Sequence, residues 1–440
     1  MGFTRALVDS VRTLQYDDVP EEAREVGRQC LLDFLGCAVA GAREEPVEIL
    51  IAAVARPEAS REAALIGRDE RASRLTAALV NGTAAHALDY DDTHAAMNGH
   101  PSAPVVPALL ALAEDVDGRR FLTALVAGIE LECRLGVRLG GRHYATGFHA
   151  TGTLGTFGAA AACAHLLGLD EDAWLRAIGI AGSEAAGIKA AFGTMTKPLH
   201  AGRAASAGAL AALLAAGGFT APPDVLETAQ GFAETHAGVV PERLEDVASR
   251  FLIRDTLFKY HAACYLTHAA IEAAGRLRVA HALDPHAIES VVVTVAPSLL
   301  GVCNIASPTT GLEGKFSLRA TTALSLLGED TGAIATYSDA KIRDGAVVRL
   351  RDRVRVEVDR ERSPMRARVV VVAGGRRLED EVDTGVPASD LAAQRRRLRK
   401  KFDGVAGAAL GARRAGELAE VALAVDRLPS VRDLVRRLGG

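Results

Sequence analysis

The chain has 440 residues, of which 49% are hydrophobic and only 4% aromatic, so it can bury a large core made of closely packed helices. A net charge of −4 excludes the electrostatic attraction to phosphates that nucleic-acid binding requires, and a solvated helix face explains the basic run from Arg395 to Lys401. We therefore expect no nucleic-acid partner.

The N-terminal residues MGFTRALVDSVRTL place charges at helical spacing, whereas a secretory signal needs an unbroken apolar stretch, so we expect a cytoplasmic protein. The six cysteines are scattered without a CxxC pair, which favours reduced core residues over disulfides or a zinc framework. The apolar stretch 204–218 is shorter than the roughly 18 residues of a membrane span and ends at two glycines. We expect a buried helix there and no membrane partner.

Helical periodicity dominates the chain up to about residue 250. With stops at glycine or proline, it predicts helices over 21–40, 73–89, 103–115, 118–139, 154–167, 171–186 and 198–216. No strand pattern interrupts them.

The pattern changes after about residue 285. The segments 288–295, 347–358 and 366–372 are β-branched and partly alternating, which predicts strands and a smaller α+β domain. Helical periodicity returns near residue 387, and we expect the last stretch to pack back onto the first domain. A cleft between two domains is where a ligand is expected.

The residues capable of acid–base chemistry are concentrated in four segments inside this small-residue background. They are HALDYDDTHAAMNGHPSAP (86–104), HYATGFHATGT (143–153), GTMTKPLHAGR (193–203) and FKYHAACYLTH (258–268). Such clustering is typical of an active site assembled from several loops.

In the first segment, helical spacing places His86, Asp89 and either Asp92 or Thr93 on one face. One interpretation is a metal site, because imidazole and carboxylate together suit zinc, manganese or iron. A motif such as HExxH, which would supply the usual three catalytic ligands, is missing.

A structural interpretation of the same residues is that Asp91, Asp92 and Thr93 end a helix and turn the chain, with their charges solvated. We favour a third interpretation, in which an acid and a hydroxyl orient His100. That histidine follows in a GHPSAP turn, which is too rigid for a helix interior.

The second segment places Tyr144 and His149 before a run in which glycine recurs every third residue. The run is not GxGxxG and follows no strand, so helix packing explains it better than dinucleotide binding. We expect His149 at a helix N-terminus, where the positive end of the dipole lowers its pKa and makes a neutral base available. The alternative is a structural histidine.

In the third segment Thr196 is predicted to cap a helix with Pro198 in its first turn. Lys197 would then lie among free amide groups that bind anions. Lys259 in the fourth segment is likewise an ammonium among bulky apolar neighbours. Two such cations predict a substrate with two or more carboxylates.

Together these segments resemble the MmgE/PrpD family, which includes 2-methylcitrate dehydratases, cis-aconitate decarboxylases and iminodisuccinate epimerases. The matching motifs are HALDYDDTH followed by GHPSAPVVPALLALAE, then GFHATGTLGTFGAAAA, GTMTKPLHAGRAA and KYHAACYLTHAAIEA. The resemblance is specific over about residues 30–270 and weaker beyond. It implies a mainly α fold, with an all-helical domain from 1–254 and 388–440, a smaller α+β lid domain from 255–387, a homodimer, and no metal or other cofactor.

By resemblance to the decarboxylases, the catalytic positions are His100, His149, Asp89 and Thr93. The same resemblance makes Lys197 and Lys259 the substrate-binding positions. Beside them we expect four further residues to line the pocket: His200, Arg203, His261 and Cys264. His100 would be the principal acid or base with His149 as its partner, while Asp89 and Thr93 would orient His100. For each of the pocket-lining residues the alternative interpretation is a purely structural role.

The chain departs from the decarboxylase pattern at two places. Cys264 stands where the decarboxylases have a histidine, and the pair Arg319, Ala320 replaces a tyrosine expected after KFSL. These departures leave the substrate open.

We therefore predict a cofactor-independent lyase, of dehydratase or decarboxylase type, that acts on a small di- or tricarboxylic acid through a carboxylate-stabilised carbanion. The first alternative is an epimerase or isomerase of a similar acid, because the same proton abstraction serves both. A catalytically inactive binding homologue and a metal-dependent hydrolase are further alternatives.

Overall fold

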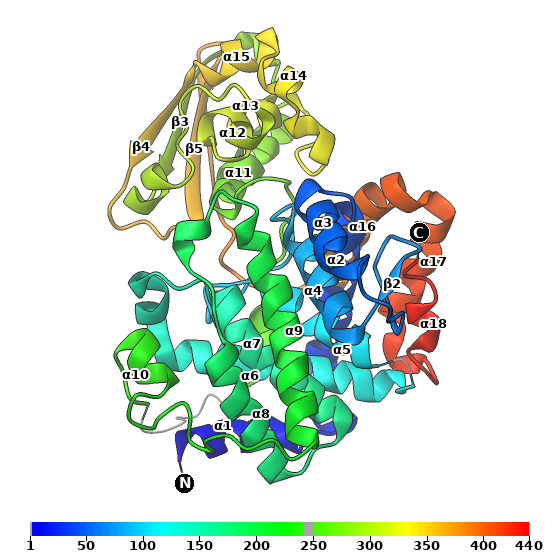
Figure 1. Cartoon of the computed structure of the whole chain (residues 1–440). Helices are drawn as coiled ribbons and strands as arrows, with labels where there is room; N and C mark the ends of the chain where they lie inside the picture. Colours follow the sequence, from blue (N-terminus) through cyan, green and yellow to red (C-terminus); the bar gives the residue numbers. More distant parts are fainter. Residues whose placement is uncertain (1, 114, 242–249, 440) are drawn as a thin grey trace. The chain divides into compact units, whose positions relative to one another are not determined.

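A computed structural model describes residues 2–113, 115–241 and 250–439 of the chain. The chain forms two compact units, one made of the residues up to Phe258 together with those from Ala388 onward, the other of Lys259–Pro387. Helices predominate and strands are few, so the predicted mainly α fold with a small α+β region is confirmed (Figure 1).

The first unit is helical. Its helices are α1 (Phe3–Arg12), α2 (Glu21–Gly41), α3 (Glu45–Leu50), α4 (Arg74–His86), α5 (Ser102–Leu112), α6 (Gly118–Thr146), α7 (Ala150–Leu167), α8 (Glu171–Glu184), α9 (Thr196–Ala216), α10 (Phe232–Ala237), α16 (Leu391–Leu410), α17 (Ala412–Leu423) and α18 (Arg432–Val435). Each helix predicted before residue 250 is present, with ends shifted by a few residues. The main exception is α6, which continues past residue 139 until Gly147 ends it with a φ of 118°. Two antiparallel strands of two residues each, β1 (Ala63–Ala64) and β2 (Arg71–Ala72), lie between these helices in the chain. The expectation that no strand interrupts the helices is therefore wrong.

Small residues let the central helices of this unit pack closely. Helix α9 packs against α4 and α7, and a Cβ placed on Gly202 would lie 2.1 Å from the Leu79 carbonyl oxygen. A Cβ on Gly208 would lie 2.5 Å from the Cβ of Ala159. Helix α9 is also long and apolar enough to cross a membrane, yet 61% of its most apolar window is buried inside the protein. Its packing is that of a core helix, as predicted for 204–218.

Helix α16 brings the C-terminal segment against α2. Gln394 donates to the Gln29 side chain at 2.8 Å, and the Lys401 ammonium donates to the Asp33 carboxylate at 2.6 Å. The prediction of a solvated basic run is therefore wrong at its last residue, because Lys401 lies on the buried face of α16.

The second unit contains a four-stranded sheet of β3 (Ile288–Val295), β4 (Val354–Val358), β5 (Arg366–Ala373) and β6 (Arg376–Asp383) in the order β4-β3-β5-β6. Strands β3 and β4 are parallel and the other pairs antiparallel. Its helices are α11 (His268–Ala280), α12 (Gly311–Lys315), α13 (Leu318–Leu327), α14 (Asp339–Ile342) and α15 (Gly345–Arg351).

Two strand predictions in this unit need correction. The predicted strand 347–358 is a strand only from Val354, because the Asp344 side chain caps the helix α15 that precedes it. Strand β6 was not predicted because its sequence RRLEDEVD is mostly charged, which suits an edge strand and lacks an apolar signal.

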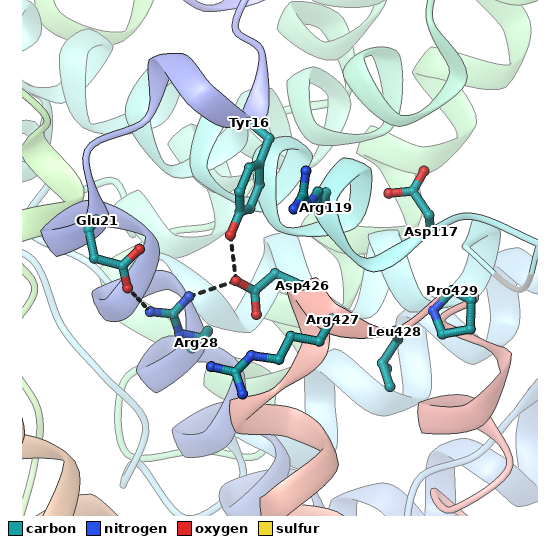
Figure 2. Close-up of a pocket in the computed structure, with 9 residues that line it drawn as sticks. All are labelled: Tyr16, Glu21, Arg28, Asp117, Arg119, Asp426, Arg427, Leu428 and Pro429. Atoms are coloured by element: carbon teal, nitrogen blue, oxygen red, sulfur yellow. Dashed lines mark hydrogen bonds and ion pairs between the residues drawn. The ribbon is translucent and has the colours of Figure 1, made fainter.

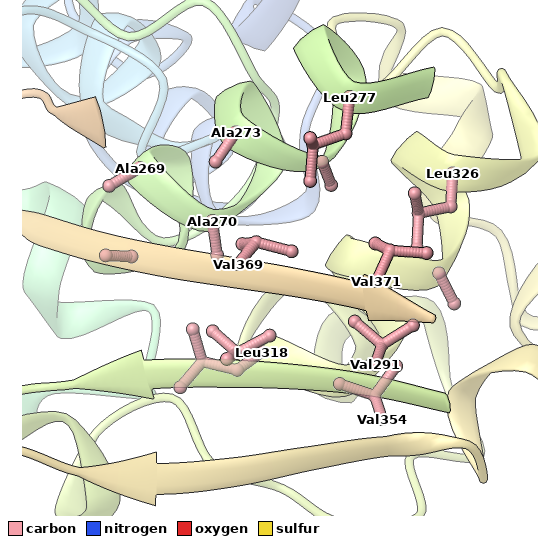
Figure 3. Packing of buried hydrophobic residues seen from close by; sticks show 14 of the residues in the cluster. Ala269, Ala270, Ala273, Leu277, Val291, Leu318, Leu326, Val354, Val369 and Val371 are labelled. Atoms are coloured by element: carbon pink, nitrogen blue, oxygen red, sulfur yellow. The ribbon is translucent and has the colours of Figure 1, made fainter. Parts of the chain in front are cut away.

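The core of the second unit lies between the sheet and helices α11 and α13. Figure 3 shows Ala270 and Ala273 of α11 on the same side of β5 as Val369, while Val291 of β3 lies near Val354 of β4. Aliphatic side chains on a twisted sheet fill this core, whereas close helix contacts form the core of the first unit.

Candidate active site

The first polar segment is a turn and not a continued helix. Ser73 caps α4, which ends at His86, and Asp89 adopts a left-handed φ of 50°. The predicted helical face of His86, Asp89 and Asp92 or Thr93 is therefore wrong. The turn instead directs successive acidic side chains to different neighbours.

A buried carboxylate links two histidines in this turn. Both oxygens of Asp91 lie 3.0 Å from Nδ1 of His86, and one lies 3.2 Å from Nδ1 of His100. Burial alone would raise the pKa of Asp91, but the two imidazoles outweigh it and hold the pKa well below its usual range. Burial lowers the pKa of His86 to about 4, so this histidine is neutral near pH 7.

Asp92 is also fully buried and has a different environment. Ser102, at the start of α5, donates its backbone N–H and its hydroxyl to the Asp92 carboxyl group, the latter at 2.5 Å. Burial, and then the nearby charges of Asp33 and Asp91, raise the pKa of Asp92 to about 8. The structural interpretation of Asp91 and Asp92 as solvated charges is therefore wrong for both residues, which are 0% exposed.

Lys197 and His100 share one carboxylate. The Lys197 Nζ lies 2.8 Å from Oδ1 of Asp89, and the same oxygen is 3.6 Å from Nε2 of His100. The side chains of Asp89 and Lys197 are 31% and 17% exposed, so this side of the cluster reaches solvent, whereas the Asp91 side chain on the other side is fully buried.

Two threonines hold the backbone around His100. The Thr93 hydroxyl donates to the Gly99 carbonyl at 3.1 Å, and the backbone of Thr93 pairs with Leu257. The His100 amide donates to the hydroxyl of Thr151, in the first turn of α7, at 3.0 Å. Thr93 thus acts on the turn that carries His100 and not on the imidazole itself.

His149 precedes α7 as its N-cap residue, where the sequence placed it. Its Nδ1 lies 3.0 Å from Nδ1 of His200, and its ring stacks on that of His86 with centroids 5.8 Å apart. Its pKa lies far below the ordinary histidine value because of burial first and then of nearby His86 and Lys197. The direction matches the prediction, but burial is a larger cause than the expected helix dipole.

Helix α9 delivers Lys197 and His200 to the cluster. The helix begins at Thr196, whose backbone N–H donates to the Thr194 hydroxyl. Thr196 is therefore the first helical residue and not the predicted cap. Pro198 lies in the first turn as expected. Arg203, further along α9, is 57% exposed and lies 3.8 Å from Glu184, and the cluster does not include it.

The remaining predicted substrate-binding residues belong to the second unit. His261 lies 2.7 Å from the Thr331 hydroxyl and 3.2 Å from Glu272, and Cys264 packs beside the core of that unit. Lys259 is its first residue. Their relation to His100 stays a prediction.

A metal ion is the alternative occupant of the cluster. His86, Asp89, Asp91 and His100 offer ligand atoms within 4.8 Å of one another, and this donor set suits zinc, manganese or iron. The Lys197 ammonium already neutralises Asp89, and His86 is bound to Asp91. A divalent ion would therefore have to displace an ammonium, which makes the set a better fit for proton transfer than for metal binding.

A cavity of about 580 Å³ lies elsewhere in the same unit. It is lined by Tyr16, Glu21, Arg28, Asp117, Arg119, Asp426, Arg427, Leu428 and Pro429. Figure 2 shows Asp426 bridging the Tyr16 hydroxyl, at 2.6 Å, and the Arg28 guanidinium, at 2.8 Å. Glu21, Arg28 and Asp426 are paired with one another, and no histidine lines the cavity. We therefore place the candidate active site at the histidine cluster.

Sequence reasoning underestimated Asp91 and His86. Both lie in HALDYDDTH, but the sequence suggests His86 only as a possible metal ligand and Asp91 only as a residue that turns the chain. The available signal was the number of acidic residues beside an Ala-rich helix, since three carboxylates in four positions cannot all be equally solvated next to such a packing surface.

The comparisons with known proteins agree with the sequence motifs. Residues 5–243 match the model of the MmgE/PrpD N-terminal domain, and residues 261–427 match that of the MmgE/PrpD C-terminal domain. The chain is 32% identical over 295 residues to a cis-aconitate decarboxylase of Homo sapiens, covering 63% of this chain and 60% of that protein. It is 30% identical over 298 residues to the cis-aconitate decarboxylase of Aspergillus terreus, with 63% and 60% covered. The matches span about three fifths of these relatives' length, and the two domain matches show that the chain belongs to the MmgE/PrpD family.

Proposed function

We propose that the protein is a lyase, of decarboxylase or dehydratase type, that acts on a small di- or tricarboxylic acid through a carbanion next to a carboxylate. One observation carries the proposal: the Lys197 ammonium and the His100 imidazole converge on the same oxygen of Asp89. The relatives named cis-aconitate decarboxylases support a polycarboxylate as the substrate class.

In this proposal Asp89 marks the place where a carboxylate binds between an ammonium and an imidazole. A substrate carboxylate that competes for Lys197 would bring its α carbon near His100. The ammonium would stabilise the negative charge that develops on that carboxylate, and such donors contribute most in a site that excludes water.

His100 would move the proton. Its Nδ1 faces the buried Asp91 and its Nε2 faces the more exposed Asp89, so one nitrogen is held by a fixed anion while the other is available. His149 is neutral because its pKa is strongly lowered, and it would donate or accept a hydrogen bond to the substrate, with His200 selecting its tautomer.

The two lyase reactions differ in the bond that breaks. In decarboxylation a carbon–carbon bond breaks, carbon dioxide leaves, and the electron pair stays on the carbon that His100 protonates. In dehydration His100 removes the α proton and a hydroxyl leaves with a proton from a second acid. In epimerisation, the alternative, the proton returns to the opposite face.

Several predictions from the sequence accompany this proposal. We propose that Lys259 binds a second substrate carboxylate and that Arg203, His261 and Cys264 line the pocket. We also propose that the protein is a cytoplasmic homodimer that needs no cofactor.

The test is proton NMR in deuterium oxide with a panel of small di- and tricarboxylic acids that includes cis-aconitate. Carbon dioxide, which has no proton and is therefore trapped and measured separately, supports decarboxylation, and a new vinylic signal formed from a hydroxy acid without carbon dioxide supports dehydration. Exchange of the proton at the α carbon for deuterium, with inversion of that carbon, would show an epimerase and not a lyase. The absence of any reaction with every acid in the panel would contradict the proposal. Stoichiometric metal in active protein, with loss of activity on chelation, would favour the metal-dependent alternative.

A further inference from the structure

The loop that carries Asp89, Asp91 and Asp92 is attached to the C-terminal segment by one buried side chain. The Nζ of Lys401 donates to Oδ1 of Asp33 and to the carbonyl oxygen of Tyr90, both at 2.6 Å. The same Nζ lies 4.1 Å from the centre of the Tyr90 ring. Tyr90 thus has its backbone and its ring held by one ammonium.

The position of Lys401 on its helix is unusual for a lysine. The buried residues of α16 include Gln394, Leu398, Lys401, Phe402 and Val405, a spacing that defines the face packed against α2. The Lys401 side chain is only 4% exposed and that of Asp33 only 1%. Burial of an ammonium costs free energy unless the charge is paired, so a lysine here has a role other than keeping the helix surface soluble.

The charge balance around the loop points to the same residue. Three carboxyl groups are almost completely buried, those of Asp33, Asp91 and Asp92. Asp91 raises the pKa of Asp33, and Asp33 and Asp91 both raise the pKa of Asp92. Lys401 supplies a buried cation on the side of Asp33, whereas the imidazoles of His86 and His100 lie on the side of Asp91.

We propose that Lys401 is a positioning residue for the reaction, because its ammonium fixes the Tyr90 carbonyl and so sets the directions of Asp89 and Asp91 on either side. This inference rests on the proposed role of His100, which both carboxylates contact. It also gives the C-terminal segment a part in the site although it supplies no residue to the histidine cluster.

The test needs a variant that removes the anchor without leaving a buried charge. Lys401→Met alone leaves Asp33 unpaired in the core and is expected to lower stability strongly. The double variant Asp33→Asn, Lys401→Met removes both charges and frees the Tyr90 carbonyl. Lys400→Met is the matched control, because Lys400 is the exposed neighbour on the same helix.

Melting temperature, amide hydrogen exchange and steady-state kinetics are compared in these proteins. We expect the double variant to keep a melting temperature near that of the unmodified protein, while amide hydrogen exchange in 88–102 becomes at least tenfold faster. We expect kcat to fall at least tenfold with KM changed less than threefold, because orientation and not binding is lost. Lys400→Met should match the unmodified protein in all three.

Unchanged exchange and unchanged kcat in a folded double variant would overturn the proposal and leave Lys401 a purely structural residue. If the unmodified protein turns over no acid in the panel, the proposed function fails, and the exchange measurement alone then decides whether Lys401 holds the loop. Faster exchange spread evenly over the whole chain would also overturn it, because that result indicates general destabilisation.

Discussion

Helix α2 meets the C-terminal segment at two places rich in charge, and they differ in burial and in pairing. Beside the cavity of Figure 2, Arg28 contacts Glu21, Glu25 and Asp426. Under the histidine cluster, Asp33 is bound to Lys401 and lies near Asp91 and Asp92. The same residue types, Asp and Glu with Arg or Lys, therefore build both places.

Pairing decides what each place can do. Burial would raise the pKa of Glu25, but Arg395, Gln29 and Arg28 outweigh it and lower the pKa, so the group stays ionised and has a structural role. Asp92 receives its hydrogen bonds from the neutral Ser102, and its pKa rises to about 8. Incomplete pairing thus makes the place under the histidine cluster sensitive to pH near neutrality, whereas the paired carboxylates beside the cavity stay ionised.

The strongest test of this contrast is His100→Asn. We expect kcat to fall by about 10²–10⁴, the usual contribution of a general acid or base. His165→Asn is the control, since His165 bonds only the Leu14 carbonyl in the described residues, and it should retain activity. A His100→Asn variant with more than a tenth of the original kcat would remove His100 from the mechanism.

Lys197→Met should lower kcat/KM by about 10²–10³, because it removes the donor that stabilises developing negative charge. It also leaves Asp89 without its ammonium. Lys189→Met is the control, because Lys189 donates to the Tyr144 carbonyl and not to Asp89. Equal losses in the two variants, measured with steady-state kinetics, would contradict a specific role of Lys197.

Asp91→Asn should lower kcat by about 10², the cost of a misplaced reacting group. The variant keeps the shape of the side chain but removes the charge between His86 and His100. The same measurement on Asp403→Asn, an exposed aspartate on α16 paired with Arg399, should show no loss. An active Asp91→Asn would show that this carboxylate only fills space.

Asp92→Asn should change stability and not activity. The folded-state pKa of Asp92 is about 8 and its ordinary value is 3.8, so between these values the folded state keeps a proton that the unfolded state has lost. Stability due to this group is therefore present below pH 4 and is lost as the pH rises towards 8, by up to ~1.4 kcal/mol per pH unit.

Urea unfolding at pH 5 and at pH 8 tests this effect. The free energy of unfolding should fall less between the two values in Asp92→Asn than in the unmodified protein. His86 and His143, whose pKa values are lowered to about 4, destabilise the fold below pH 6.5, but they do so in both proteins and cancel in the difference. Identical pH dependence would show that Asp92 is ionised in the folded protein.

The smallest effect is expected in the cavity of Figure 2. Tyr16→Phe removes one hydrogen bond to Asp426 and should cost about 1 kcal/mol of stability, while kcat stays within twofold. A large loss of activity in this variant would mean that the cavity contributes to function, and it would contradict the purely structural role assigned to the charges beside it.

Local sequence signals predicted much of the fold. The periodic apolar residues of α2 and α4 and the β-branched runs of β3 and β5 each act over a few neighbouring residues. The family resemblance came from short motifs of the same kind. Strand β6 was not predicted from the sequence, because an edge strand needs few apolar residues.

The sequence by itself thus determined the helical core, the positions of the main strands, the family and the segments that carry the histidines. The tertiary structure decided which charges in them are buried. Asp91, Asp92 and Lys401 look like solvated surface residues in the sequence, yet helices α2, α5 and α16 enclose them. Burial of a charge depends on partners far away in the chain, such as Asp33 for Lys401, and no local pattern encodes such a pair.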